Sequence, residues 1–265
     1  MKAVQLPKYE VAPELVDVPD PEITAPLDIV VKIGGAGVCR TDLHIIEGQW
    51  ADKTGVPLPY TLGHENAGWV SAVGSAVTNV AVGDPVILHP LVTCGLCRAC
   101  RFGDDVHCTN SSFPGIDSDG GYAEYLKTTA RSAIKLDASL QPAGVAALAD
   151  AGLTAYHAVA KAARRLRPGD RAVVIGAGGL GHIGVQVLRA LSPVEMIVVD
   201  RNPDALALAN DLGADHTVVA NDDTVAAVQD LTDGNGAEAV IDFVGEGVAV
   251  EVGVACLRRN GNYYV

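Results

Sequence analysis

The sequence predicts an α/β protein in two parts, a β-rich domain over residues 1–152 and a doubly wound parallel sheet over residues 153–265. In the first part, short runs of β-forming residues are separated by glycine and proline, which is typical of an antiparallel barrel or sandwich. From about Ala151 the rhythm changes to alternating strands and helices, which is typical of a parallel sheet covered by helices. The 265 residues, 49% of them hydrophobic, allow a substantial core.

The expected elements follow in order from this pattern. The strands of the first part, each bounded by turn-forming residues, are expected at residues 29–33, 68–74 and 84–88. The strands of the second part are expected at residues 171–175, 195–200, 216–219, 238–243 and 261–265. Residues 180–191 have helical spacing, and Asn202 and Pro203 cap and open a helix expected to end at Gly213.

The last expected strand coincides with the end of the sequence. A doubly wound fold usually has a sixth strand, whereas the sequence stops within the fifth. The second domain is therefore expected to be incomplete.

Charge and composition exclude several classes of partner. The formal net charge is −13, from 19 Lys and Arg against 32 Asp and Glu, which argues against nucleic acid or an anionic membrane as the main partner. No apolar run approaches the roughly 20 residues of a membrane span, and residues 1–8 have no apolar signal-peptide core. We therefore expect a soluble cytoplasmic protein, in which six cysteines need a use other than disulfides.

Four of the cysteines form a cluster with the spacing C-x2-C-x2-C-x7-C. They are Cys94, Cys97, Cys100 and Cys108. Four thiolates this close can surround a tetrahedral Zn²⁺ and leave no open coordination position, so the cluster predicts a structural rather than a catalytic zinc site. Disulfides, an iron–sulfur cluster and plain buried thiols are the alternatives, although the spacing does not match the ferredoxin pattern.

A second candidate set is dispersed along the chain and comprises Cys39, His64 and Asp150. Taken singly, each has an ordinary interpretation: a buried thiol, a hydrogen-bonded histidine and a helix-capping carboxylate. Taken together, Cys, His and Asp with one open position are typical of a catalytic zinc site.

A glycine-rich turn lies between an expected strand and an expected helix. It has the pattern G-x-G-x-x-G and includes Gly176, Gly178, Gly179, Leu180 and Gly181. Its glycines allow the backbone to approach a pyrophosphate at the amino end of a helix, where the partial charge is positive. Asp200 ends the next strand and can accept hydrogen bonds from the ribose hydroxyls of a dinucleotide, which favours NAD over NADP. Arg201 can reach a phosphate or stack on adenine, and the alternative is a purely structural turn.

These motifs occur in an order that resembles a known family. Residues 37–42, residues 63–68, the four-cysteine loop, residues 120–125 and the glycine-rich turn together resemble the zinc-dependent medium-chain alcohol dehydrogenases. The resemblance covers essentially the whole chain. It implies a GroES-like catalytic domain followed by a Rossmann domain that binds NAD.

The resemblance also implies roles for single residues. Cys39, His64 and Asp150 would hold the catalytic zinc, as in bacterial NAD-dependent members with Asp as the third ligand, and the four clustered cysteines would hold the structural zinc. The remaining implied roles involve side chains next to these ligands. They are a carboxylate that can enter or leave the metal shell (Glu65), a proton path (Thr41 and His44), an acid that orients His64 (Asp42) and a pyrophosphate contact (Arg40). Without the family resemblance, Thr41 could equally be an ordinary turn residue, and His44 could be an imidazole on the protein surface.

The implied activity is zinc-dependent hydride transfer between a primary or secondary alcohol and NAD, giving an aldehyde or ketone. Zn²⁺ lowers the pKa of bound water from about 15.7 to roughly 7, and an alcohol should respond similarly. Two alternatives stay open: a polyol or amino-alcohol dehydrogenase of the same family, and a non-catalytic, zinc-stabilised nucleotide-binding fragment. Family members form homo-oligomers through segments beyond residue 265, so the oligomeric state is left open as well.

Overall fold

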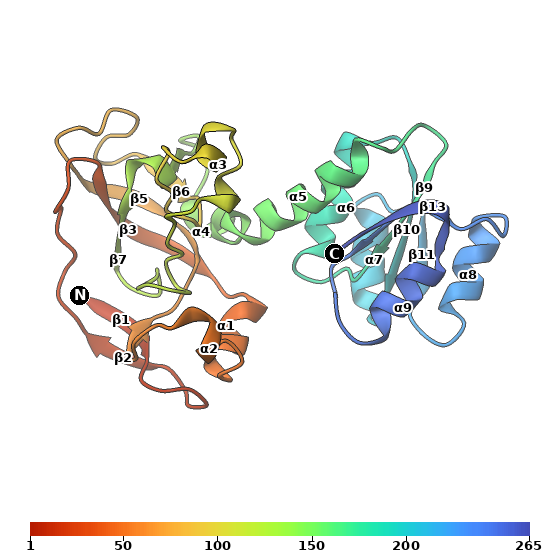
Figure 1. Ribbon diagram of the computed structural model, residues 1–265, viewed down its shortest axis with the longest axis horizontal. Helices are drawn as coiled ribbons and strands as arrows, with labels where there is room; N and C mark the ends of the chain where they lie inside the picture. Colours follow the sequence, from red (N-terminus) through yellow and green to blue (C-terminus); the bar gives the residue numbers. More distant parts are fainter. The chain divides into compact units, whose positions relative to one another are not determined.

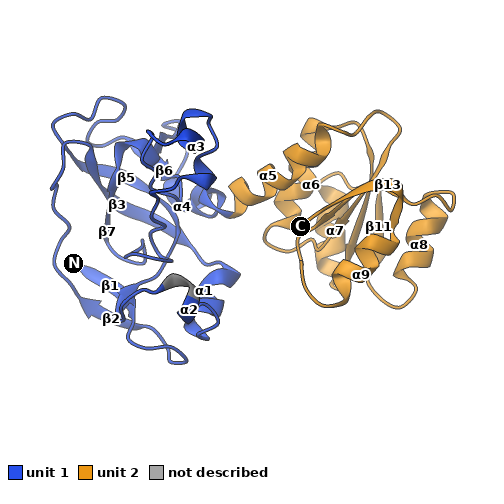
Figure 2. Ribbon diagram, viewed as in Figure 1, with its two compact units in different colours: residues 1–150 blue, residues 151–265 orange. Residues whose placement is uncertain are grey.

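The computed structural model describes residues 1–52 and 55–265 of the chain. The chain forms two compact units, Met1–Asp150 and Ala151–Val265 (Figures 1 and 2). The division falls after Asp150, compared with the boundary after residue 152 that we expected from the sequence.

Unit 1 contains two antiparallel sheets, as the alternation of short strands and turns predicted. The smaller sheet has the order β2 (Glu14–Asp17), β1 (Lys2–Leu6), β4 (Tyr60–Thr61). The larger sheet has the order β7 (Tyr125–Thr129), β3 (Asp28–Gly37), β5 (Glu65–Val73), β6 (Pro85–Leu88), β8 (Ala133–Lys135). Alternate residues of its strands, such as Ile29, Val31, Val70 and Val86, face inward and form a buried core.

Short helices connect these strands, and two of them carry candidate site residues. The helices of unit 1 are α1 (Arg40–Ile46), α2 (Ala51–Thr54), α3 (Arg98–Arg101) and α4 (Pro142–Val145), with 3-10 turns η1 (Asp105–His107), η2 (Ala130–Ser132) and η3 (Ala146–Ala149). Helix α1 follows β3 directly and begins beyond Cys39, while α3 lies within the four-cysteine loop. A second core of Leu6, Ile45 and Leu62 anchors α1 to the smaller sheet.

Unit 2 is a doubly wound α/β fold, as predicted. Its parallel sheet has the order β11 (His216–Val219), β10 (Glu195–Asp200), β9 (Arg171–Ile175), β12 (Ala237–Asp242), β13 (Leu257–Tyr264). Its helices are α5 (Ala151–Ala163), α6 (Gly181–Leu191), α7 (Pro203–Asp211), α8 (Thr224–Leu231) and α9 (Val248–Ala255). Sheets of this kind bind ligands at the carboxyl ends of their strands, which is where the glycine-rich turn lies.

The interiors of the central strands β9 and β10 are continuously hydrophobic because both faces of the sheet are covered. On one face Ala172 and Val174 pack against α5, α6 and α7. On the other face Val173 and Ile175 pack against α8 and α9. Within the described ranges, no helix is long and apolar enough to cross a membrane.

The boundaries of β13 and α7 differ from those expected. Strand β13 begins at Leu257 rather than at residue 261, because its pairing with β12 shifts register between Ala237 and Ala239. Gly261 lies inside the strand, where an added Cβ would be only 2.9–3.0 Å from neighbouring atoms. Helix α7 ends at Asp211, ahead of Gly213, whose φ of +107° is outside the helical region.

Candidate metal centres and glycine-rich turn

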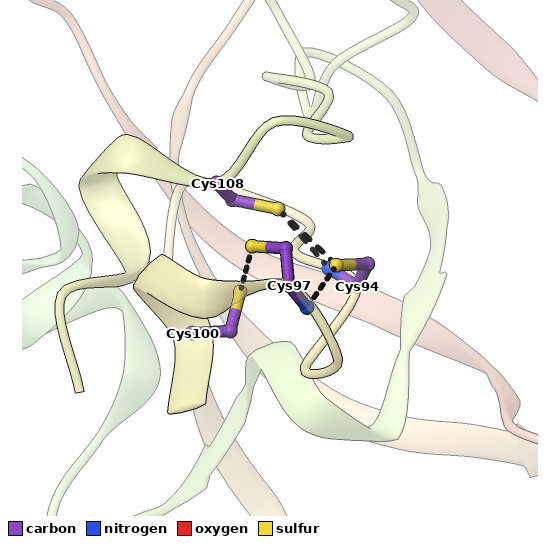
Figure 3. A group of neighbouring side chains, drawn as sticks. All are labelled: Cys94, Cys97, Cys100 and Cys108. Atoms are coloured by element: carbon purple, nitrogen blue, oxygen red, sulfur yellow. Dashed lines mark hydrogen bonds between the residues drawn. The ribbon is translucent and has the colours of Figure 1, made fainter. Parts of the chain in front are cut away.

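The four clustered cysteines converge in the loop around α3 (Figure 3). All four sulfur atoms lie within 4.8 Å of one another. The Sγ–Sγ distance is 3.5 Å between Cys97 and Cys100 and 3.6 Å between Cys94 and Cys108. A tetrahedral zinc with Zn–S bonds of about 2.3 Å requires sulfur–sulfur distances of about 3.8 Å. The residues present therefore fit a closed four-thiolate zinc site.

Backbone amides of the loop point at the sulfurs. The amide of Cys97 donates to Sγ of Cys94, and the amides of Cys94 and Asn110 donate to Sγ of Cys108, each at 3.4 Å. Amide donors favour the thiolate and lower the pKa of Cys94, and they lower that of Cys97 to about 6. Burial raises the pKa of Cys100 to about 12, so the loop favours thiolates at Cys94 and Cys97, and a divalent cation would balance the charge of all four.

The dispersed candidates also come together. Cys39 is the residue before α1, His64 is the residue before β5, and Asp150 follows η3. One ligand atom from each lies within 4.8 Å of the others, and His64 Nε2 is 3.6 Å from Asp150 Oδ2. Three segments that are distant in sequence therefore supply a sulfur, a nitrogen and an oxygen to one point of unit 1.

The orientation of the His64 ring is set by Asp42. Oδ1 of Asp42 lies 3.3 Å from Nδ1 of His64, and Oδ2 accepts a 2.9 Å hydrogen bond from the amide of Cys39. Because Asp42 occupies the Nδ1 side, Nε2 faces Cys39 and Asp150 as a metal-ligating nitrogen would. Both side chains of the pair are only 1% exposed.

The electrostatics of this site favour a cation. Burial disfavours the charged imidazole of His64, but the carboxylate of Asp42, the Cys39 side chain and Asp150 outweigh it and raise its pKa to about 10. Neither ring nitrogen of His64 has a hydrogen-bond partner among the described residues, so Nδ1 is held next to Asp42 by charge and Nε2 is available to a metal. A positive charge is therefore stabilised at a buried nitrogen between a thiol and a carboxylate. The three residues fit a zinc site in which a fourth position stays open.

Glu65 and Gly37 form a tight pair beside Cys39. Glu65 begins β5 and is 2% exposed, and it pairs with Gly37 of β3. A Cβ at position 37 would lie 2.1 Å from Oε2 of Glu65, so a larger residue there would displace this carboxylate. The structure thus buries a further acid on the strand that follows His64.

Helix α1 carries the other side chains singled out from the sequence. Thr41 and His44 are three residues apart and partly exposed, which places both on one side of the helix. Nδ1 of His44 lies 3.8 Å from Oε2 of Glu47. Arg40, at the start of the helix, is exposed.

The glycines of the glycine-rich turn between β9 and α6 are of two kinds. Gly176 has φ +84°, a backbone conformation that favours glycine. A Cβ at Gly181 would lie 1.8 Å from the carbonyl oxygen of Gly176, so this position also needs glycine. A Cβ at Gly178 or Gly179 would meet nothing within 4 Å, so the exposed side of the turn is open. Leu180 completes the turn as the residue before α6.

Asp200 lies at the carboxyl end of β10 and contacts this turn. Its Oδ2 accepts a 2.6 Å hydrogen bond from the amide of Ala177, and its Oδ1 accepts one of 2.8 Å from the amide of Asn202. Arg201 follows and is exposed. The carboxylate therefore lies at the edge of the sheet where the sequence predicted a ribose-binding acid.

Comparison with known proteins assigns the chain to a family. Residues 25–138 match the alcohol dehydrogenase GroES-like domain, and residues 179–265 match the zinc-binding dehydrogenase family. An NAD-dependent alcohol dehydrogenase of Sulfurisphaera tokodaii is 35% identical over 270 residues, covering 99% of this chain and 77% of that protein. The chain belongs to the zinc-dependent medium-chain alcohol dehydrogenase family.

Two further relatives indicate how wide this dehydrogenase family is. The crystal structure of the alcohol dehydrogenase from Aeropyrum pernix is 46% identical with a TM-score of 0.96, covering 99% of this chain and 77% of that chain. An L-threonine 3-dehydrogenase of Bacillus velezensis is 33% identical, covering 100% of this chain and 76% of that protein. The chain is thus similar to enzymes named for different substrates.

One half-buried residue of the dehydrogenase has contacts that the sequence analysis did not anticipate. Tyr122 lies in the segment 120–125, which contributed to the family resemblance without a role for the side chain. Its phenol lies 2.9 Å from Oδ2 of Asp42 and 2.9 Å from the carbonyl oxygen of Gly37. The ring packs on Gly63, where a Cβ would lie 2.4 Å from it, and a contact between residues this far apart gives no local signal in the sequence.

The second such residue is Asp242, at the carboxyl end of β12 in the dehydrogenase. Oδ1 of Asp242 accepts hydrogen bonds from the amides of Val244 (2.7 Å) and Gly245 (3.0 Å), and Oδ2 accepts one from the phenol of Tyr263. Val244 is also the side chain that a Cβ at Gly176 would meet, at 2.8 Å. Asp242 therefore fixes a turn that packs against the glycine-rich turn.

Proposed function

We propose that this zinc dehydrogenase oxidises primary or secondary alcohols to aldehydes or ketones, with NAD as the hydride acceptor, and catalyses the reverse reduction. The observation that carries the proposal is the convergence of Cys39, His64 and Asp150, whose ligand atoms lie within 4.8 Å of one another. When bound there, zinc would supply a Lewis acid that lowers the pKa of an alcohol or polarises a carbonyl.

The charges of the three ligands suit this chemistry. The Cys39 thiolate and the Asp150 carboxylate would together balance the two positive charges of zinc. His64 would be the neutral ligand, with Nδ1 facing Asp42. In our proposal the buried Glu65 is the nearby carboxylate that can enter or leave the metal shell.

The proton released from the alcohol needs a route to water. We assign that route to the hydroxyl of Thr41 and the imidazole of His44, which share one side of α1. An imidazole can take up a proton at one ring nitrogen and release one from the other, as a proton path requires. Side-chain exposure of 24% gives His44 access to solvent.

We assign NAD to the open side of the glycine-rich turn. The amides of Gly178, Gly179, Leu180 and Gly181 would face the pyrophosphate at the amino end of α6. Asp200 would accept hydrogen bonds from the ribose hydroxyls and repel a 2′-phosphate. The exposed guanidinium of Arg40 would pair with the pyrophosphate, and that of Arg201 would stack on the adenine.

The experiment combines metal analysis with NADH formation from primary, secondary and benzylic alcohols. We expect about two zinc ions per wild-type chain, and one zinc with no dehydrogenase activity in Cys39→Ala. The matched control is Cys256→Ala, which removes a buried thiol from unit 2 and should leave both zinc ions in place. Two zinc ions in Cys39→Ala would refute the catalytic metal assignment.

A second candidate is oxidation of an amino alcohol or a polyol at the same site. The similarity to an L-threonine 3-dehydrogenase at 33% identity supports it. Since substrate choice depends on pocket shape, the alcohol panel should include L-threonine and a polyol. A kcat/KM for either that exceeds the values for all simple alcohols would favour this candidate.

We also propose that the protein functions in a reducing compartment such as the cytoplasm. The support is that all six cysteines are free thiols in the structure, although two pairs of sulfurs are within 3.6 Å. Reaction of the denatured chain with a thiol reagent should find six free thiols after purification without reductant. Fewer than six would indicate an oxidising location.

A further inference from the structure

We propose that Tyr122 is a positioning residue for the catalytic metal site, acting through Asp42 on His64. Its phenol holds the Asp42 carboxylate, which in turn sets the orientation of the His64 imidazole. The inference rests on the metal function proposed above for Cys39, His64 and Asp150.

The contacts around Asp42 form a short chain of polar groups. Oδ2 of Asp42 accepts hydrogen bonds from the amide of Cys39 and from the phenol of Tyr122, each at 2.9 Å, and the single phenolic proton is shared with the carbonyl oxygen of Gly37, also at 2.9 Å. Oδ1 lies 3.3 Å from Nδ1 of His64. Asp42 thus connects the backbone of one ligand residue to the side chain of another, and Tyr122 is the hydrogen-bond donor outside that pair.

Burial makes each donor to Asp42 important. The carboxylate is 1% exposed, and among the ion pairs of the described residues its partner is His64. A buried carboxylate is stable in its charged form only when hydrogen bonds replace those it had with water. Removing the phenol would leave Oδ2 with the Cys39 amide, so the carboxylate would be less firmly held.

Tyr122 is itself fixed to the segment that carries His64. Its amide donates to the carbonyl oxygen of Leu62 (2.9 Å), and the neighbouring Gly121 amide donates to that of Gly63 (2.7 Å). A Cβ at Gly63 would lie 2.4 Å from the Tyr122 ring, so the ring crosses a backbone position that only glycine permits. The phenol therefore reaches Asp42 from a position that is fixed relative to His64.

The test is Tyr122→Phe in the zinc-loaded chain of 265 residues. The ring and its packing on Gly63 remain, and only the hydroxyl is lost. Outer partners of metal-ligating histidines typically contribute a factor of 10–100 in metal affinity. We expect zinc affinity at the catalytic site to fall about 10-fold, measured by competition with a chelator. Zinc at the four cysteines serves as an internal reference and should be retained as in the wild type.

Tyr60→Phe is the matched control. Tyr60 belongs to the same core as Tyr122, and its buried hydroxyl has no hydrogen-bond partner among the described residues. We expect both zinc affinities to match the wild type. Loss of catalytic zinc in Tyr60→Phe equal to that in Tyr122→Phe would mean that the effect is one of packing, and would overturn the inference.

A double-mutant cycle with Asp42→Asn tests whether Tyr122 acts through Asp42. If it does, Tyr122→Phe should weaken zinc binding much less in the Asp42→Asn background than in the wild type. Equal losses in both backgrounds would overturn the inference, as would unchanged affinity in Tyr122→Phe or equal weakening of both zinc sites. A wild-type chain that binds zinc only at the four cysteines would instead refute the proposed function, and this inference with it.

Discussion

The amide of Ala177 donates a 2.6 Å hydrogen bond to Oδ2 of Asp200, which joins the glycine-rich turn to the end of β10. Oδ1 of the same carboxylate accepts from the amide of Asn202. Asp200 is thus fixed on both sides, at the carboxyl ends of two neighbouring strands. A carboxylate held in this way is well placed to accept hydrogen bonds from the hydroxyls of a ribose. It would also repel a phosphate group on the same ribose.

We predict that Asp200→Ala weakens NAD binding by at least 10-fold and NADP binding much less. The variant loses two ribose hydrogen bonds to a charged group, each contributing about 1.5 kcal/mol or more, whereas for NADP it also removes a repulsion. Fluorescence titration with both reduced cofactors measures the two affinities. Asp204→Ala, which removes an exposed carboxylate of α7, is the charge-matched control. Equal losses for both cofactors in Asp200→Ala would contradict the ribose role.

The two kinds of glycine in the turn should respond differently to alanine. Gly181→Ala places a Cβ 1.8 Å from the carbonyl oxygen of Gly176 and should lower the free energy of unfolding by roughly 1–3 kcal/mol. Gly178→Ala meets no atom within 4 Å and should change it by less than about 0.5 kcal/mol, while obstructing a pyrophosphate. Urea unfolding and cofactor titration separate the two effects. Strong cofactor binding by Gly178→Ala would argue against a phosphate on this side of the turn.

Removal of one thiolate from the four-cysteine site should affect stability and metal content together. We predict that Cys97→Ser binds one zinc instead of two and has a lower midpoint of thermal unfolding. The cause is that the loop around α3 loses the cation that balances its thiolates. Metal analysis and thermal unfolding in the presence and absence of a chelator measure both quantities. If the chelator lowers the midpoint of Cys97→Ser as much as that of the wild type, the stabilising metal lies elsewhere.

The ion pairs at the amino ends of β9, β10 and β11 predict a pH dependence. Glu195 accepts from Nε2 of His216 at 2.7 Å and from Nε of Arg171 at 3.0 Å, and these contacts lower its pKa. A carboxyl group whose pKa is lowered by folding stabilises the folded state above its ordinary value of 4.5. That contribution is lost as the pH falls through the lower folded value.

The corresponding variant is Glu195→Gln. We expect it to lower the free energy of unfolding by less than about 1 kcal/mol at neutral pH, because the side chain is 38% exposed and the pairs are screened by solvent. The difference from the wild type should shrink as the pH falls below 4.5. Urea unfolding at several pH values gives this profile, and a difference that grows toward acid pH would show the opposite sign of linkage.

Local patterns in the sequence predicted the fold and two of the sites, because their physical causes are local. The four cysteines lie within 15 consecutive residues, and Gly176 to Gly181 form a single turn between a strand and a helix. In contrast, Cys39, His64 and Asp150 come from segments far apart in the sequence, and their types alone left ordinary interpretations open. Only the family resemblance connected them, and the structure brings their ligand atoms together.

Tyr122 and Asp242 show what such patterns leave out. Each acts through hydrogen bonds to side chains or amides that other elements supply, at Asp42 in one case and at Val244 and Tyr263 in the other. Neither residue type nor spacing indicates such partners. The start of β13 at Leu257 has a similar cause, since the shift of register depends on the neighbouring strand β12.

All seven candidate zinc ligands are encoded before position 151, and the last of them, Asp150, is the final residue of unit 1. The glycine-rich turn and Asp200 are encoded entirely after that point. A genetic exchange directly downstream of codon 150 would therefore transmit the full set of ligands intact while replacing the nucleotide preference. The zinc ligands and the cofactor preference can therefore be inherited from different parent genes.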